Sequence, residues 1–277
     1  MTMVPTLSRR ALMTVAAADL LVALVVVSGI LAVTPAGVVA AAVVTPFSLV
    51  GYVTAYRLYR SAREAGATPR DALRAIGEAL VPLPVRRLVR AESANLAGVG
   101  QWARRRVDGV PQDGTALPYA KQQRPLLLML LFAVIVQAVA LEWMVAAMDA
   151  PAGLRAVVMA ADVYSLLFVL ALGAACVTRP HVVTSDELRI RYAAYFDLRV
   201  PRELIASVKE SRSFDARGVI SVRDGGLMVG VDAQTNLIVR LTRPVAVTRP
   251  LGRREHVTTI RFYAEDPASA LKSLTTP

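Results

Sequence analysis

Cysteine and histidine are almost absent from this chain of 277 residues, which has one cysteine, Cys176, and two histidines, His181 and His256. A single thiol excludes an intramolecular disulfide, a Cys-x-x-Cys redox centre and a cysteine zinc cluster. The two histidines are not spaced to share a metal ion on one helix face. The sequence therefore predicts no metal site and no cofactor, because metal chemistry would have to rest on carboxylates alone.

The chain also lacks the short motifs that accompany common catalytic sites. It contains no G-x-S-x-G nucleophile elbow, Walker phosphate loop, H-E-x-x-H zinc motif or dinucleotide fingerprint. His181, which follows the last apolar run, is a minor catalytic candidate, and Cys176 is more simply read as buried than as lipid-modified. These absences leave the question of an enzyme open but favour a non-enzymatic protein.

Lysine is scarce as well, since Lys121, Lys209 and Lys272 are the only lysines among 32 basic residues. We interpret the excess of arginine as the codon bias of a GC-rich bacterial genome. The net charge is +11, yet aromatic residues are not interleaved with basic ones as in proteins that bind single-stranded nucleic acid. The charge therefore indicates cytoplasmic loops and contact with anionic lipid, and no nucleic acid is predicted as a partner.

Apolar residues are in excess, at 55% of the sequence with a mean hydropathy of +0.48. A membrane span needs about 20 mainly apolar residues. Four runs meet this requirement: Ala11–Val33, Val38–Tyr56, Pro125–Met148 and Leu154–Val177. Short turns join the first run to the second and the third to the fourth. We therefore predict an α-helical membrane domain of four transmembrane helices, arranged as two hairpins.

Basic residues are distributed unequally on the two sides of these spans. Arg9 and Arg10 precede the first span and the segment 57–124 is dense in arginine, whereas the turns inside the hairpins carry little positive charge. Because cytoplasmic loops carry the excess of Lys and Arg, we expect a bacterial inner-membrane protein with both termini cytosolic. The residues around Arg9 and Arg10 also loosely resemble a twin-arginine export signal, and cleavage there would remove the first span without changing the topology.

Changes in sequence character divide the chain into four predicted parts. These are a first transmembrane hairpin over 1–60, a cytosolic helical region over 61–123, a second transmembrane hairpin over 124–178 and a soluble domain over 179–277. In the cytosolic region, Thr68-Pro69 predicts a helix start with threonine as N-cap and proline at the first position. A second helix is expected from Pro84, and a linker from Gly109 to Gln123.

The helix expected from Pro84 combines an apolar stripe with arginines. The stripe consists of Val85, Leu88, Val89, Leu96, Val99 and Trp102. The candidate membrane-surface residues are Arg86, Arg87, Arg90, Arg104, Arg105 and Arg106. The sequence leaves two placements open. The helix either lies in the membrane interface with its arginines at anionic headgroups, or packs on the C-terminal domain with a solvated basic face.

From His181 onward, short alternating segments replace the apolar blocks. We predict strands over 181–184, 187–192, 196–200, 205–210, 227–231, 236–241 and 257–262. A closing helix follows Asp266, which is the expected N-cap, with Pro267 at the first helical position. Ala270, Leu271 and Leu274 are expected on the buried side of this helix.

The segment VVTSDELRIRYAAYFDLRVPRELIASVKES resembles bacterial pleckstrin-homology-like domains that are attached to membrane spans. The matching positions are Thr184, Leu188, Ile190, Val200, Pro201, Ile205 and Val208. The resemblance covers about residues 178–275 and implies a pleckstrin-homology-like β barrel with a closing C-terminal helix. The segment Pro244–Arg254 departs from the family pattern as an insertion, and the basic pocket of phosphoinositide-binding relatives is not present in the sequence.

Three acids, Asp19, Glu142 and Asp162, fall within the predicted spans, where ionisable groups are costly and often functional. Glu142 and Asp162 are expected at similar depth on neighbouring antiparallel helices, where two carboxylates could share a proton or bind a cation. Alternatively, Glu142 reaches the interface beside Trp143 while Asp19 and Asp162 bond to nearby hydroxyl groups.

Together these features predict a non-enzymatic scaffold or regulatory membrane protein. Its cytosolic domain is expected to bind the anionic lipid surface, a partner protein or a second copy of the chain. The alternative is a subunit of a cell-envelope lipid transport or biosynthesis system that uses Asp19 and Asp162.

Overall fold

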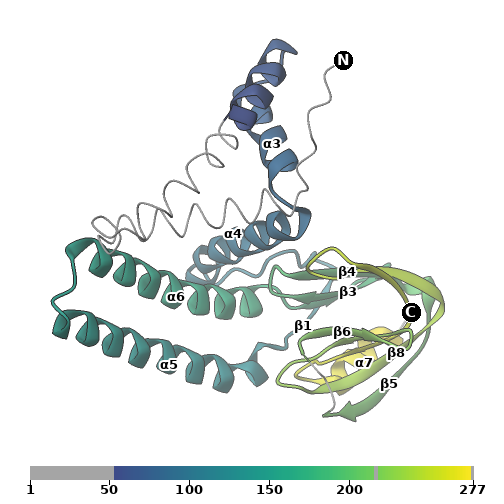
Figure 1. Cartoon of the computed structure of the whole chain (residues 1–277). Helices are drawn as coiled ribbons and strands as arrows, with labels where there is room; N and C mark the ends of the chain where they lie inside the picture. Colours follow the sequence, from purple (N-terminus) through teal and green to yellow (C-terminus); the bar gives the residue numbers. More distant parts are fainter. Residues whose placement is uncertain (1–52, 215–217, 276–277) are drawn as a thin grey trace. The chain divides into compact units, whose positions relative to one another are not determined.

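The computed structural model describes residues 53–214 and 218–275 (Figure 1). These residues fall into two compact units. The first contains residues 53–86 and 136–164, and the second contains residues 87–135 and everything described from Ser165 onward.

Two helices are long and apolar enough to cross a membrane. Helix α5 covers Ala120–Ala147 and contains an 18-residue stretch with a mean hydropathy of 2.3, and α6 covers Ala152–Thr178 and contains one with a mean hydropathy of 2.1. They correspond to the predicted third and fourth spans, although α5 begins five residues before Pro125. The predicted first span, Ala11–Val33, lies outside the described residues. Of the second, only residues 53–56 are described, and they are helical.

In the first unit, the predicted helix start at Thr68 is confirmed. Helix α3 covers Pro69–Leu80, and the Thr68 side chain accepts a hydrogen bond from the backbone N–H of Asp71 at 3.2 Å. Ala72 is the buried residue of this helix, whereas Leu73 is exposed.

The second unit contains a β domain built from two antiparallel-rich sheets. The first sheet has the order β1-β2-β3-β4 and the second has the order β5-β8-β9-β7-β6. The strands are β1 (Thr115–Leu117), β2 (His181–Val183), β3 (Glu187–Tyr192), β4 (Phe196–Pro201), β5 (Ile205–Ser213), β6 (Ile220–Arg223), β7 (Gly226–Val229), β8 (Thr235–Thr248) and β9 (Arg254–Phe262). A short 3-10 turn, η1 (Arg202–Leu204), links β4 to β5. Helix α7 (Pro267–Thr275) follows the last strand.

All seven predicted strands are present in the β domain, together with two that were not predicted, β1 and β6. The segment 244–254, expected to depart from the family pattern as an insertion, extends β8 and β9 into a long hairpin that pairs Val245 with Val257 and Thr248 with Arg254. Pro244 lies within the register shift between Arg240 and Val245. A proline is tolerated there because the irregularity removes the need for its missing N–H in the ladder.

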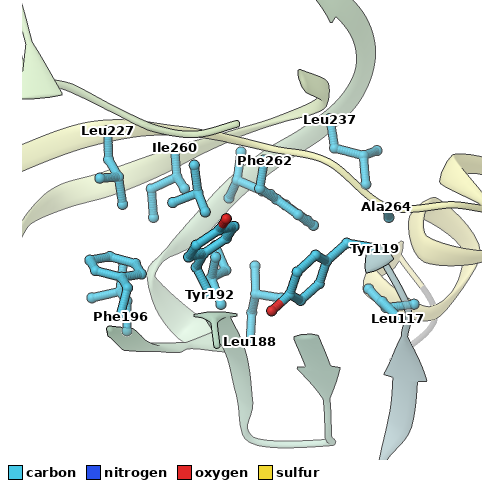
Figure 2. Close-up of a cluster of buried hydrophobic side chains, with 14 of the residues drawn as sticks. Leu117, Tyr119, Leu188, Tyr192, Phe196, Leu227, Leu237, Ile260, Phe262 and Ala264 are labelled. Carbon is cyan, nitrogen blue, oxygen red and sulfur yellow. The ribbon is translucent and has the colours of Figure 1, made fainter. Parts of the chain in front are cut away.

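The two sheets bury a common apolar core between them. Leu188 and Ile190 from the first sheet and Ile260 and Phe262 from the second are fully buried in one cluster, and Leu227 is 1% exposed (Figure 2). Burying a side chain of this size contributes about 1.5–3 kcal/mol. The alternating burial along β3 and β9 is therefore what holds the two sheets together.

The closing helix α7 was predicted correctly, including its cap. Asp266 Oδ1 accepts a hydrogen bond from the Ser269 N–H at 3.0 Å. Ala270 and Leu274 are buried, whereas Leu271, also expected on the buried side, is only partly buried. At the other end of α7, the Arg202 guanidinium donates to the carbonyl oxygen of Leu274 at 2.9 Å, which satisfies a carbonyl that the helix leaves free.

Candidate functional site

The N-terminal end of α5 and the C-terminal end of α6 pack against the β domain. Strand β1, just before α5, pairs with β2, just after α6, through Thr115 with Val183 and Leu117 with His181. Gln123 on α5 donates a hydrogen bond to the Tyr192 hydroxyl of β3, and its Oε1 accepts from the Cys176 thiol on α6 at 3.6 Å. The helix ends and the β domain therefore form one packed structure.

Cys176 and His181, the two residues weighed for chemistry in the sequence, are both buried in this packed structure. The Nδ1 of His181 accepts a hydrogen bond from the Arg191 backbone N–H at 3.0 Å, and its Nε2 lies 3.1 Å from the Tyr263 carbonyl oxygen. The Nε2 therefore carries the proton and donates it to that carbonyl. Burial lowers the pKa of His181 to about 3. A neutral ring with both nitrogens occupied by the backbone has a structural role, so the catalytic candidate is not supported by its surroundings.

Helix α4 (Leu83–Ala103) packs on the β domain and on the end of α6 through a face of small and polar residues. From Arg87 onward, this face consists of Ala91, Asn95 and Gly98. The Oδ1 of Asn95 accepts a hydrogen bond from the Ala194 N–H at 2.9 Å. A Cβ at Gly98 would lie 3.6 Å from the Cα of Ala175. A Cβ at this distance would make an ordinary van der Waals contact, so the helices pack with room for little more than a methyl group at Gly98.

The apolar stripe predicted for α4 lies away from this docked face. Leu88 is 43% exposed, Val89 is 57% exposed and Leu96 is 44% exposed, and Trp102 near the end of the helix is 54% exposed. The helix therefore has one face that holds it to the β domain and a second, apolar face that nothing in the described part of the chain covers.

The six candidate arginines fall into three groups. Arg86, in the first unit, lies 3.7 Å from Glu78. Arg87 and Arg90 line a groove beside the β domain. The remaining three, Arg104, Arg105 and Arg106, are exposed just beyond the end of α4. Arg104, Arg105 and Arg106 lie outside the helix that was expected to contain all six, because α4 ends at Ala103.

The groove beside α4 has a volume of about 420 Å³. On one side it is lined by α4, and on the other by the tip of the β8–β9 hairpin, residues 249–251. Arg179, directly after α6, also lines it. Sequence reasoning missed this groove because it joins four distant segments, the fourth being residues 194–197, although the arginines of the 244–254 segment were a usable signal.

Two of the three acids in the predicted spans are described, Glu142 on α5 and Asp162 on α6. Glu142 lies five residues before the end of α5 at Ala147, and Asp162 lies ten residues after the start of α6 at Ala152. Asp162 is 8% exposed, and its Oδ2 is buried without a hydrogen-bond partner among the described residues. Asp19 lies outside the described residues.

Comparisons with known proteins give this chain no relative. No protein-family model matches it, and neither a curated protein nor a solved structure is detectably similar. Within residues 53–214 and 218–275, no group of three His, Cys, Asp or Glu side chains is arranged to hold a metal ion. Functional inference must therefore start from the packing of α4, the groove and the apolar helices.

Asn95 is expected to control how firmly α4 is held to the β domain. The substitution Asn95→Ala removes the acceptor of the Ala194 N–H, and leaving a buried donor unsatisfied costs about 1–3 kcal/mol. Amide hydrogen exchange over residues 87–103 should therefore become about tenfold faster or more. The neighbouring change Ser93→Ala, at an exposed position that bonds only its own helix, should leave exchange unchanged. Equal exchange in both variants would mean that Asn95 does not hold the helix.

Proposed function

We propose that this chain is a multi-pass protein of the bacterial inner membrane whose cytosolic β domain, a pleckstrin-homology-like module, binds the anionic surface of that membrane without catalysing a reaction. Two membrane-length helices, α5 and α6, support the membrane assignment. The order of strands followed by a closing helix is what the sequence resemblance leads one to expect.

The observation that carries the proposal is the double-sided packing of α4. Ala91, Asn95 and Gly98 hold the helix beside the end of α6, while Val89 and Leu96 stay exposed. An amphipathic helix with exposed apolar residues and arginines lies in the membrane interface, with the apolar side chains among the acyl chains. Because α4 is fixed at the end of a membrane-length helix, the leaflet surface is the nearest apolar partner.

The proposal can be tested through Trp102, because the chain contains only two tryptophans. In a Trp143→Phe background, Trp102 becomes the sole tryptophan of the full chain. In nanodiscs of brominated lipid, its emission should be quenched more strongly when the lipid is anionic than when it is neutral. Each arginine near an anionic surface contributes about 1 kcal/mol, so Arg104→Gln with Arg106→Gln should remove most of the difference.

The outcomes of this experiment separate the possibilities. Equal quenching in anionic and neutral discs would show that charge does not attract the helix. Absence of quenching in both would place α4 away from the lipid, and its exposed stripe would then serve a protein partner or a second copy of the chain. Raising the salt concentration should weaken the anionic preference, since exposed charges are screened.

A second candidate, a subunit of an envelope-lipid transport or biosynthesis system, is favoured by one observation. Asp162 is buried within a membrane-length helix with one carboxylate oxygen unpartnered among the described residues. Buried acids in such helices commonly serve proton or substrate pathways. If the chain has this function, lipid transport or biosynthesis should depend on Asp162 and on Asp19.

A further inference from the structure

The groove between α4 and the β8–β9 tip has a cationic lining with little internal neutralisation. Four arginines line it: Arg87, Arg90, Arg179 and Arg249. Its acidic lining residue, Asp197, is already bonded by Arg189 at 2.8 Å, outside the groove. The groove lining therefore carries a net positive charge, which its four arginines supply.

Two of these arginines already have carboxylate partners. Arg179 lies 3.2 Å from Asp108, and Arg249 lies 3.5 Å from Glu255. In the described part of the chain, neither Arg87 nor Arg90 is ion-paired with a carboxylate. These two guanidinium groups are therefore available for an external anion, and guanidinium groups match phosphate oxygens with paired, charge-assisted hydrogen bonds.

The Arg87 guanidinium lies beside the hairpin tip. Gly252 has a φ of +99°, which a residue with a side chain rarely adopts, and a Cβ there would lie 3.5 Å from the Arg87 guanidinium. The tip is closed by a hydrogen bond from the Gly252 N–H to the Arg249 carbonyl at 2.8 Å. The Arg87 side chain therefore lies against the hydrogen-bonded backbone of the tip instead of extending freely into solvent.

The rim of the same groove is apolar. Leu88 on α4 is 43% exposed and Leu251 at the hairpin tip is 63% exposed, and both line the groove. A cationic interior between two exposed leucines fits a ligand with a phosphate at one end and acyl chains at the other. Free phosphate has no apolar part that could contact the two leucines. Arg179, which lines the groove, directly follows the membrane-length helix α6.

We propose that this groove is a discrete binding site for the phosphate headgroup of an anionic phospholipid, with Arg87 and Arg90 as the phosphate-binding residues and Leu88 and Leu251 against the acyl chains. The inference rests on the proposed membrane-surface function and goes beyond it, because it replaces a diffuse attraction with one saturable site formed by four distant segments.

The test is native mass spectrometry of the full chain in detergent, titrated with phosphatidylglycerol, phosphatidylcholine or glycerol phosphate. One phosphatidylglycerol should bind with an affinity at least tenfold above that of phosphatidylcholine. Glycerol phosphate should bind at least tenfold more weakly than phosphatidylglycerol, because it lacks acyl chains. Arg87→Gln with Arg90→Gln should weaken phosphatidylglycerol binding at least tenfold.

Two further pairs of substitutions locate the effect. Arg223→Gln with Arg240→Gln removes the same charge from exposed positions elsewhere in the β domain and should leave the affinity within twofold. The pair Arg104→Gln and Arg106→Gln should lower the anionic preference of Trp102 in nanodiscs while the single lipid remains bound. Leu251→Gln should weaken phosphatidylglycerol binding without changing that of glycerol phosphate.

Two results would overturn the inference. If the groove pair and the Arg104/Arg106 pair weaken lipid binding equally, the attraction is diffuse, and the membrane-surface function stands without a discrete site. If glycerol phosphate binds as tightly as phosphatidylglycerol, the groove takes a soluble phosphate ester and not a lipid. The membrane-surface function itself fails only if Trp102 also shows no preference for anionic discs.

Discussion

Replacing Tyr119 with alanine is expected to destabilise the β domain by about 4 kcal/mol, since truncating a buried aromatic residue typically costs about 3–5 kcal/mol. Tyr119 is fully buried between the two sheets (Figure 2). Its ring stacks on His181 at a centroid distance of 4.7 Å, and its hydroxyl accepts a hydrogen bond from the Ala193 N–H at 2.9 Å. The substitution removes both contacts and leaves a cavity.

Thermal unfolding of the detergent-solubilised full chain, followed by near-ultraviolet circular dichroism, should show this loss as a fall in Tm on the order of 10 °C. Tyr119→Phe keeps the ring but leaves the Ala193 N–H unsatisfied, so it should cost about 1–3 kcal/mol. Phe214→Ala, at a residue that is 68% exposed, should change stability by less than about 0.5 kcal/mol. A wild-type Tm for Tyr119→Ala would mean that the segment before α5 is not part of the core.

Tyr119 also shows where the sequence was insufficient. It follows β1, a strand of three residues, which is too short to display a period of two. The strand forms because Thr115 to Leu117 pair with β2, more than sixty positions later in the chain. Nothing local distinguishes such a segment from a linker, and the segment from Gly109 to Gln123 was accordingly predicted as one.

The strands of the β domain were predictable where burial alternates locally. Leu188 and Ile190 are fully buried, as their spacing in the LRIRY segment indicates. The same segment contains an exception, because Arg191 is 2% exposed. Its guanidinium donates to the Pro180 carbonyl at 2.8 Å and to the Asp108 carbonyl at 3.0 Å. Paired carbonyls make the burial of a charge tolerable, and sequence pattern does not reveal them.

Helix α4 was located correctly, but its docked face was not. Hydrophobic periodicity selects Val89 and Leu96, which are exposed. The residues that contact the β domain and α6 are Asn95, which accepts a hydrogen bond from Ala194, and Gly98, which lies beside Ala175. Helices packed through small residues give no apolar signal. The candidate site depended on the same information, since the groove exists only once α4, Arg179 and the hairpin tip are brought together.

The stability of the β domain is expected to fall as the pH drops below about 6.5, because of His181. Burial lowers the pKa of His181 to about 3 in the folded protein, against an ordinary value of 6.5, and the positive charge of Arg191 acts in the same direction. Protonation would also place a second N–H against the Arg191 N–H, which Nδ1 now accepts. The unfolded chain therefore takes up the proton at a higher pH than the folded chain does.

Because the unfolded chain binds this proton more readily, the free energy of unfolding rises with pH between about 3 and 6.5. The contribution of neutral His181 is complete above pH 6.5 and is lost as the pH falls toward 3, at a rate of up to about 1.4 kcal/mol per pH unit. Between pH 6.5 and pH 5, where most carboxylates still stay ionised, this amounts to about 2 kcal/mol. Denaturant unfolding of the full chain at a series of pH values measures it.

His181→Asn isolates this contribution, because asparagine offers an acceptor to the Arg191 N–H but takes up no proton in this range. The variant should be less stable than the wild type at pH 7, since it loses the ring contacts with Tyr119 and Phe262. Its stability should nevertheless be nearly constant between pH 6.5 and pH 5. His256→Asn, at an exposed position, should keep the wild-type slope. A His181→Asn variant that loses stability as steeply as the wild type would assign the acid sensitivity to other groups and show that His181 is not held neutral by the core.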